Sequence, residues 1–415
     1  MARPKAISLY SGAGGLDYGF EAAGFETAVA LEMDADCCNT MRRNRSWSVI
    51  ERSIFEVPSD EILAAGRLKR GEAAVLIGGP PCQPFSKAGF WVRGDAKRLD
   101  DPRANTLGAY MRVLEDTLPQ SFLLENVEGL AFARKNEGLE LLLSLIDDIN
   151  RRNKTRYRPV FQVVKAAEHG VPQLRQRFIM VASRDGDDFR FPQATHGPIE
   201  TRRGQLRLGT LAPYRRAWDA LGDEEPPPAE DLHVRGKWAD LLPSIPEGEN
   251  YLWHTPRGGG MPLFGWRRRY WSFLLKLAKD KPSWTIQAQP GPAIGPFHWT
   301  SRLLSMRELA RIQTFPENVV VTGSRGAIQR QLGNAVPSLL GEVLGRAIRT
   351  QLLGLKLNAS APRLLPLDRG AAPPPEPRAR VPRRFHLLKG DHDAHPGTGK
   401  GYRAVSWAGG ASVGA

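Results

Sequence analysis

The sequence has 415 residues, with 58 Lys and Arg against 44 Asp and Glu, a formal net charge of +14 and a pI near 9.9. Its length predicts two domains with an appended segment, and its basic balance indicates a polyanionic partner, because phosphates attract Lys and Arg. No apolar run approaches the roughly 18 residues of a membrane helix, and the three cysteines, Cys37, Cys38 and Cys82, form neither a disulfide framework nor a CxxC metal pair. Because the N-terminus runs directly into a short apolar strand rather than a signal peptide, we expect a soluble cytoplasmic protein.

A strand, a tight turn and a helix open the chain. Residues 5–10 are apolar, the glycine-rich SGAGG follows, and apolar residues then recur at helical spacing. Glycines in such a turn let backbone amides approach a ligand at the positive end of the helix. The next strand ends in Glu32, close to the distance at which a dinucleotide-binding fold places an acid on a ribose hydroxyl. Asp17 occupies the third glycine position of GxGxxG, which disfavours a nicotinamide or flavin cofactor.

The alternation of strands and helices continues toward Cys82. We expect a helix over 35–43, a strand over 48–50, a helix from about Ser59 and a strand that ends in the glycines before Cys82. Repeated β-α units predict an α/β fold, a Rossmann-like, doubly wound and mostly parallel sheet with helices on both faces. Ligands bind such sheets at the carboxyl ends of the strands.

The segment GGPPCQPFS, Gly78–Ser86, places a single cysteine between prolines directly after a strand. The prolines fix their own φ and restrict the residues before them, so the turn is stiff. A thiol delivered by a strand into a rigid turn is the setting of a nucleophile. The polar, basic residues 87–102 follow and predict a mobile loop over a site.

Charged residues follow two later strands. A helix with apolar Leu107, Tyr110, Met111 and Leu114 precedes the strand SFLLEN, which ends in Glu125 and Asn126. A carboxylate at the tip of a buried strand is costly unless it is paired, which favours a functional role. Farther on, Arg175 and Arg177 share one face of an extended chain, as two phosphate or base contacts would, or as a solvated strand edge would.

The alternation ends near residue 193. Pro, Gly, Arg and Trp dominate from there to about Pro282, which predicts a second, smaller and irregular domain. Its most basic stretch places Arg267, Arg268 and Arg269 between two aromatic residues, a pattern that suits phosphate and base contact. Beyond about residue 357 the chain is rich in Pro, Arg and Gly, and we expect it to be disordered. His392 and His395 belong to this tail and are interpreted as part of it rather than as a metal site.

In their order, the motifs GGPPCQPFS, ENV, QLRQR, RLLSMRE and GNAVP resemble those of the DNA (cytosine-5)-methyltransferases over roughly residues 5–345. The resemblance implies transfer of a methyl group from S-adenosyl-L-methionine to carbon 5 of a cytosine flipped out of duplex DNA, with the Cys82 thiolate adding to carbon 6. It implies a stand-alone enzyme of the bacterial or phage restriction-modification type, monomeric and nucleoid-associated. A cognate restriction endonuclease acting on the same site is a candidate partner.

The resemblance also implies site residues. Those implied in catalysis are Cys82, Glu125, Asn126, Arg175 and Arg177. Those implied in cofactor binding are Tyr10, Gly12, Gly14, Gly15, Glu32, Met33, Ser53, Pro80, Asn334 and Ala335. Those implied in DNA binding are Ser86, Arg175, Arg177, Arg267, Arg268, Arg269 and Arg302. No metal ligand is implied. Ser53 stands where the family commonly has the aspartate of a GD dipeptide, so the adenine contact there differs from the family pattern.

The implied domain organisation is discontinuous. Residues 1–192 and 325–357 form the cofactor-binding catalytic domain, 193–300 the target-recognition domain, 301–324 a connection back, and 358–415 the disordered tail.

Three alternatives remain open from the sequence alone. The same scaffold methylates transfer RNA in one branch of the family, although the sizeable variable region favours DNA. A catalytically silent relative would bind nucleic acid as a regulatory module, which the intact motifs disfavour. A dinucleotide oxidoreductase is disfavoured by the interrupted GxGxxG.

Overall fold

The computed structural model describes residues 3–81, 105–129, 137–198, 200–202, 205–207, 211–225, 228–266, 271–357 and 359–391. The chain divides into two compact units. The large unit comprises Met1–Pro226, Pro282–Gln289 and Met306–Gly370, and the small unit comprises Pro227–Lys281, Pro290–Ser305 and Ala371–Ala415. Three separate stretches of sequence therefore build each unit.

A seven-stranded sheet forms the centre of the large unit, with the strand order β3-β2-β1-β4-β5-β8-β6. The strands from β3 to β5 in this order are parallel, whereas β8 runs antiparallel to both β5 and β6. The predicted α/β fold with a mostly parallel sheet is confirmed. The strands are β1 (Lys5–Leu9), β2 (Glu26–Glu32), β3 (Ser48–Glu51), β4 (Val75–Gly78), β5 (Ser121–Asn126), β6 (Val160–Lys165) and β8 (Gln176–Ser183).

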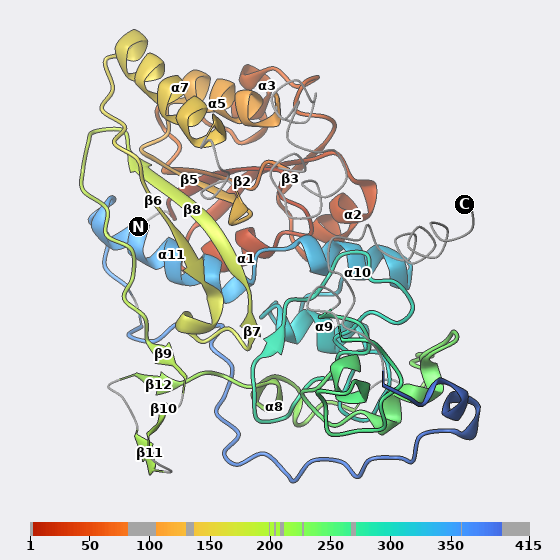
Figure 1. Cartoon of the computed structure of the whole chain (residues 1–415). Coiled ribbons are helices and arrows are strands. Elements are labelled where there is room, and N and C mark those ends of the chain that lie inside the picture. Colours follow the sequence, from red (N-terminus) through yellow and green to blue (C-terminus); the bar gives the residue numbers. More distant parts are fainter. Residues whose placement is uncertain are drawn as a thin grey trace, which may run out of the picture. The chain divides into compact units, whose positions relative to one another are not determined.

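Helices cover both faces of this sheet, as Figure 1 shows. Successive residues of β4 and β5 alternate between two hydrophobic cores, so Leu76 and Phe122 face one layer while Ile77 and Leu123 face the other. The first layer contains α3 (Ser59–Ala65), α5 (Asn105–Thr117) and α7 (Glu137–Asn153). The second contains α1 (Gly15–Ala22) and α11 (Ser338–Gln351). Two further helices, α2 (Ala35–Asn44) and α10 (Arg325–Asn334), pack against each other.

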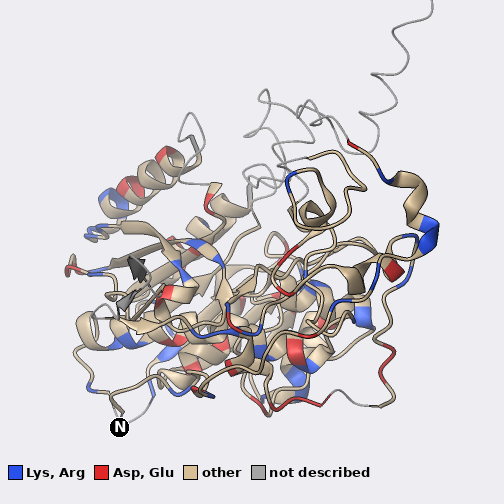
Figure 2. Ribbon diagram, turned by 60° about the horizontal axis from the view of Figure 1, so that its bottom comes forward, with Lys and Arg blue, Asp and Glu red and all other residues tan. Residues whose placement is uncertain are grey.

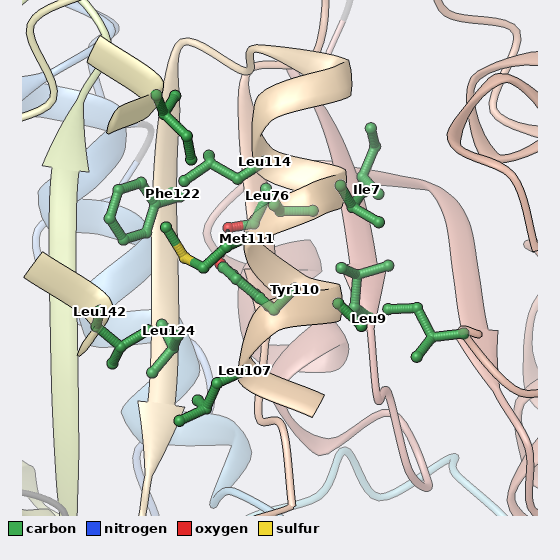
Figure 3. Close-up of a cluster of buried hydrophobic side chains, with 14 of the residues drawn as sticks. Ile7, Leu9, Leu76, Leu107, Tyr110, Met111, Leu114, Phe122, Leu124 and Leu142 are labelled. Atoms are coloured by element: carbon green, nitrogen blue, oxygen red, sulfur yellow. Dashed lines mark hydrogen bonds between the residues drawn. The ribbon is translucent and has the colours of Figure 1, made fainter. Parts of the chain in front are cut away.

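Figure 3 shows how α5 packs on the first face. Its apolar residues meet Ile7, Leu9 and Leu76 from β1 and β4, which confirms the helical spacing seen in the sequence. The Tyr110 hydroxyl donates to the carbonyls of Leu76 at 3.2 Å and Leu123 at 3.0 Å, so its polar end is satisfied inside the core.

The remaining elements are short. In the large unit they are η1 (Ala166–His169), β7 (Gln173–Leu174), β9 (His196–Gly197), β10 (Glu200–Arg202), β11 (Gln205–Arg207), β12 (Ala212–Pro213), α8 (Ala217–Leu221), β13 (Ser283–Trp284) and α9 (Met306–Ile312). In the small unit they are η2 (Ala239–Ser244), η3 (Tyr251–His254) and η4 (Arg383–Leu388). The large unit thus continues to Pro226, past the boundary near residue 193 that composition suggested.

The C-terminal segment differs from the expected disordered tail over residues 359–391. Leu364 and Leu365 pack against the second core of the large unit, and Phe385 is buried in the core of the small unit. The buried Glu342 carboxylate accepts hydrogen bonds from the main-chain N–H groups of Arg363 at 2.6 Å and Leu364 at 2.8 Å. A few apolar and hydrogen-bonded positions therefore order a segment whose average composition is typical of disorder. Residues 392–415, with His392 and His395, lie outside the described residues.

Figure 2 shows basic and acidic residues distributed over many elements rather than confined to one. Among the described residues, no helix combines the length and the apolar character needed to cross a membrane.

Helices α1 and α11 approach each other closely at glycines. A Cβ atom on Gly19 would overlap the Ser338 carbonyl and would lie 2.6 Å from the Glu342 nitrogen. A Cβ atom on Gly341 would lie 3.0 Å from the Leu16 carbonyl. Because the neighbouring atoms belong to backbone, they cannot move aside as a flexible side chain would.

We expect Gly19→Ala to lower the free energy of unfolding by about 1–3 kcal/mol, because the added methyl group forces α1 and α11 apart. Gly326→Ala in α10 is the matched control, since a Cβ atom there would meet nothing within 4 Å. The control should be neutral or stabilising by about 0.5–1 kcal/mol. Urea unfolding at pH 7 measures both, and equal stability of the two variants would contradict the tight contact.

Candidate active site

The carboxyl ends of the central strands place the predicted motifs at one edge of the sheet (Figure 1). Because β1, β2, β4 and β5 are parallel and in register, the glycine turn, Glu32, Gly78 and Glu125 all follow or end strands at this edge. The antiparallel β8 begins at the same edge, since Asn126 of β5 pairs with Phe178.

The glycine turn after β1 is open at Gly12 and closely packed at Gly14 and Gly15. Gly12 and Gly14 have φ values of 54° and 83°, in the left-handed region that favours glycine. A Cβ atom on Gly12 would meet nothing within 4 Å, so this part of the turn is open. A Cβ atom on Gly15 would instead overlap the Val336 carbonyl, so the GNAVP segment lies directly against the turn.

Glu32 is held at the end of β2 by main-chain groups. One carboxylate oxygen accepts from the Gly12 nitrogen at 2.8 Å, and the other accepts from Met33 at 2.8 Å and Asp34 at 2.9 Å. The Met33 side chain is 71% exposed beside it. The Ser53 hydroxyl accepts from the Phe55 nitrogen at 3.4 Å within its own turn. The edge thus presents a fixed carboxylate with an apolar neighbour.

Asp17, which replaces the third glycine of the dinucleotide pattern, is fully buried in α1. Thr27 donates to its carboxylate at 3.4 Å, and burial raises its pKa to about 7, opposed by the hydrogen bond with Ser8. Its side chain therefore belongs to the packing beneath the turn.

The main chain that leads to Cys82 is held by two side chains. The Asn126 amide donates to the Pro80 carbonyl at 3.2 Å, and the Thr106 hydroxyl donates to the Pro81 carbonyl at 3.1 Å. Tyr10 in turn donates to the Thr106 carbonyl at 2.8 Å. Sequence reasoning missed Thr106, because nothing local marks a contact 25 residues away. Cys82, Ser86 and the loop at 87–102 lie outside the described residues.

Glu125 forms a buried ion pair with Arg177. The Arg177 Nε atom lies 2.6 Å from Oε1, and the two side chains are only 14% and 11% exposed. Burial raises the pKa of Glu125, while the positive charges of Arg177 and Arg175 oppose this rise. A Cβ atom on Gly79 would lie 2.6 Å from Oε2, so the carboxylate occupies the space that this glycine leaves.

Arg175 is more deeply buried than a phosphate contact at an exposed strand edge would be. Its side chain, between β7 and β8, is 1% exposed, and its guanidinium donates to the carbonyls of Gly333 at 2.8 Å and Ile286 at 3.4 Å. Burial lowers its pKa well below the usual value. Arg175 is thus a buried residue held against the main chain of the GNAVP segment.

Two buried glutamines join the QLRQR and GNAVP segments. Gln173 donates to the side-chain oxygen of Gln313 at 3.1 Å and accepts from the Ile286 nitrogen at 3.2 Å. Gln313 also donates to the carbonyls of Leu332 and Ala335. Sequence reasoning missed both, since a glutamine side chain gives no local signal of a partner 140 residues away.

Helix α10 ends directly before the residues that contact the glycine turn. Asn334, the last residue of α10, is exposed, and Ala335 follows it. Arg330 bonds to Asp34 at 2.8 Å and Asp36 at 3.0 Å, which ties α10 to the start of α2. The proposed cofactor residues from the turn, β2 and α10 are therefore gathered in the large unit.

The predicted DNA-binding residues are less fully described. Arg302 lies in the small unit and donates to the Leu303 carbonyl at 3.0 Å, whereas Arg267, Arg268 and Arg269 lie outside the described residues. Within the described ranges, no group of three His, Cys, Asp or Glu residues could hold a metal ion.

We expect Arg177→Gln to lower the free energy of unfolding by about 3 kcal/mol at pH 7, because it leaves the Glu125 carboxylate buried without its partner. Burial raises the folded-state pKa of Glu125, so stability falls as the pH rises from the unfolded value, about 4.3, through the folded value. Removing Arg177 raises the folded-state pKa of Glu125 further, so it widens the pH range over which stability falls. The loss of unfolding free energy in the variant should therefore be smaller at low pH than at pH 7. Denaturant unfolding between pH 4 and pH 8 measures it.

The double variant Glu125→Gln with Arg177→Gln is the control. It removes both charges, so at pH 7 its deficit should be smaller than that of the single variant, and because it lacks the titrating carboxyl its deficit should not grow as the pH rises. A pH-independent deficit in the single variant would contradict the ion pair.

Comparisons with known proteins agree with this geometry. The C-5 cytosine-specific DNA methylase family matches residues 4–350. The chain is 40% identical over 369 residues to the Type II methyltransferase M.SacI of Streptomyces achromogenes, covering 83% of this chain and 93% of that enzyme. It is 31% identical over 341 residues to the Type II methyltransferase M.NgoFVII of Neisseria gonorrhoeae, covering 81% and 83%.

Among solved structures, a DNMT2 variant of Spodoptera frugiperda shares the fold with a TM-score of 0.57 at 16% identity, covering 84% of this chain and 99% of that one. The family match spans both the strand edge with Glu125 and Arg177 and the returning GNAVP segment. The chain therefore belongs to the C-5 cytosine-specific DNA methylase family and is a DNA (cytosine-5-)-methyltransferase.

Proposed function

We propose that the protein transfers a methyl group from S-adenosyl-L-methionine to carbon 5 of a cytosine flipped out of duplex DNA, through a bond between the Cys82 sulfur and carbon 6. The observation that supports this most directly is the buried pair of Glu125 and Arg177 beside Gly79, three residues before Cys82. This pair supplies a buried carboxyl group near the Cys82 segment, and the proposed reaction needs such a proton donor for the cytosine ring.

The open turn and Glu32 fit the proposed cofactor. Gly12 leaves space for a ligand to approach the backbone, Glu32 presents a carboxylate suited to ribose hydroxyls, and exposed Met33 offers an apolar surface for an adenine. Asn334 and Ala335 adjoin the turn through the neighbouring Val336. When bound, S-adenosyl-L-methionine supplies an activated methyl group on its sulfonium.

Carbon 5 of cytosine is a poor nucleophile, so the ring has to lose its aromaticity before it accepts a methyl group. Addition of the Cys82 thiolate to carbon 6 makes carbon 5 enamine-like. Cysteine suits this step because its thiolate is strongly nucleophilic and its free pKa is about 8.5. The hydrogen bonds of Asn126 and Thr106 orient the chain just before this residue.

Thiolate addition places electron density on ring nitrogen 3, and the Glu125 carboxyl is the group proposed to donate a proton there. Its raised pKa favours the protonated form, while Arg177 holds it in place and Arg175 is proposed to hold the carbonyl oxygen of the base. After methyl transfer, carbon 5 loses its proton to a base, and elimination of the thiolate restores the ring double bond.

This chemistry requires that the cytosine leave the base stack, because both attacking atoms approach the face of the ring. Base flipping costs a few kcal/mol and is offset by contacts to the pocket and the duplex. We assign sequence reading to the small unit and backbone contact to basic residues. We further propose that the enzyme acts as a monomer in the cytoplasm, on nucleoid DNA, alongside a restriction endonuclease of the same site.

We expect purified protein to transfer labelled methyl groups to duplex DNA and to form a covalent adduct with 5-fluorocytosine duplexes. The fluorine blocks loss of the carbon 5 substituent, so the adduct persists. Cys82→Ser should abolish both, because its hydroxyl does not replace the thiolate. Denaturing gels and filter-bound label measure the two products.

Transfer RNA is assayed in parallel. Methylation of tRNA without methylation of DNA would identify RNA as the substrate. DNA binding without methylation of either polymer would indicate a silent binding module. Transfer that persists in Cys82→Ser would refute the nucleophile.

Glu32→Gln should weaken binding of S-adenosyl-L-methionine by roughly 10- to 100-fold, because it removes a charged acceptor worth about 1.5–3 kcal/mol. Glu26→Gln is the control, since Glu26 is exposed at the opposite end of the same strand. Equilibrium dialysis without DNA measures the affinity, and equal affinities for the two variants would remove Glu32 from the cofactor site.

A further inference from the structure

The C-terminal segment 376–389 lies beyond the residues that match the family, which end at 350, and belongs to the small unit. We propose that this segment is a DNA-backbone-binding element of the enzyme, with Arg380, Arg383 and Lys389 as its phosphate contacts. The inference rests on the proposed action on duplex DNA.

An aromatic side chain anchors the segment in the core of the small unit. Phe385 is 4% exposed and stacks on Trp238, with ring centroids 5.7 Å apart and an interplanar angle of 15°. Arg384, its neighbour, pairs with Asp240 at 2.7 Å. Burial of this phenylalanine stabilises the short η4 turn against the core of the small unit.

A buried lysine anchors the start of the segment. Lys279 Nζ lies 2.8 Å from Glu376, 3.0 Å from Glu247 and 3.0 Å from the Pro374 carbonyl. The Glu376 nitrogen also donates to Glu247 at 2.7 Å. The Glu376 charge, which would otherwise oppose DNA binding, is therefore compensated within the small unit.

Two of the five basic residues in 376–389 are engaged in holding the segment. Arg384 pairs with Asp240, and Arg378 lies over the Trp253 ring at 4.9 Å. The other three, Arg380, Arg383 and Lys389, are exposed and have no hydrogen-bonded, ionic or aromatic side-chain partner within the described part of the chain.

The distribution of these three charges suits a polymer of phosphates. A single small anion is bound by groups that converge on one point, whereas these charges are spread over residues 380–389. Pro377 and Pro382 restrict the backbone, and the anchors already order it, so little conformational entropy is lost on binding. Backbone contacts of this kind add affinity without reading sequence.

The test replaces Arg380, Arg383 and Lys389 with glutamine in the full chain and measures the affinity for a duplex at several salt concentrations. Each lost phosphate contact should reduce the slope of log affinity against log salt by about 0.9, so we expect a reduction of about 2–3. Affinity at 0.15 M salt should fall roughly 10- to 100-fold, equally for duplexes of different sequence. Methylation at saturating DNA should be unchanged.

The matched control replaces Lys154, Arg156 and Arg158, three exposed basic residues of the large unit, with glutamine. This control removes the same charge. The proposal would be overturned if the slope of log affinity against log salt fell as much in the control as in the first variant. An unchanged slope in the first variant would also overturn it. Failure of the unaltered protein to methylate duplex DNA would instead refute the proposed function.

Arginine modification of the unaltered protein tests the element without any variant. Phenylglyoxal followed by mass spectrometry should modify Arg380 and Arg383 in free protein, and duplex DNA should protect both. Equal modification with and without DNA would overturn the proposal even where the glutamine variant proves unstable.

Discussion

A carboxylate buried at the end of a central strand needs a compensating charge, and in this protein Arg177 provides it for Glu125. The antiparallel direction of β8 makes this possible, because the start of β8 then lies beside the carboxyl end of β5. A parallel strand in the same position would place its first residues at the opposite edge. The antiparallel direction of this strand is therefore what brings Arg177 to Glu125. The ion pair also depends on Gly79, because the absence of a side chain there leaves room for the Glu125 carboxylate.

The site also depends on the return of the chain to its beginning. The contact between α1 and α11 at Gly19 brings the GNAVP segment against the glycine turn, where Gly15 leaves room for the Val336 carbonyl. Gln173 and Gln313 then satisfy main-chain groups on both sides of this junction. Buried amides of this kind are costly unless they are fully bonded, so they favour one arrangement of the QLRQR and GNAVP segments.

The C-terminal segment shows how composition and structure can disagree. Pro, Arg and Gly dominate it, yet Phe385 inserts into the small unit, and Glu342 and Glu247 accept main-chain N–H groups from it. A few such contacts are sufficient to order the segment, because its prolines restrict the backbone and so reduce the conformational entropy that is lost on folding. Arg380 and Arg383 stay exposed, and this exposure is the basis of the proposed contact with the DNA backbone.

Local patterns in the sequence determined the strands, the helices on both faces and the motifs at the strand ends. Hydrophobic periodicity is a local property, so the apolar positions of α5 and the tip position of Glu125 could be predicted from neighbouring residues alone. The tertiary structure decided the partners. Arg177 as the partner of Glu125, Thr106 as the residue holding Pro81 and the burial of Arg175 all depend on contacts between residues far apart in the chain. The extension of the large unit to Pro226 depends on such contacts too. Such contacts leave no periodic trace in one sequence, because each depends on how strands from separate parts of the chain align.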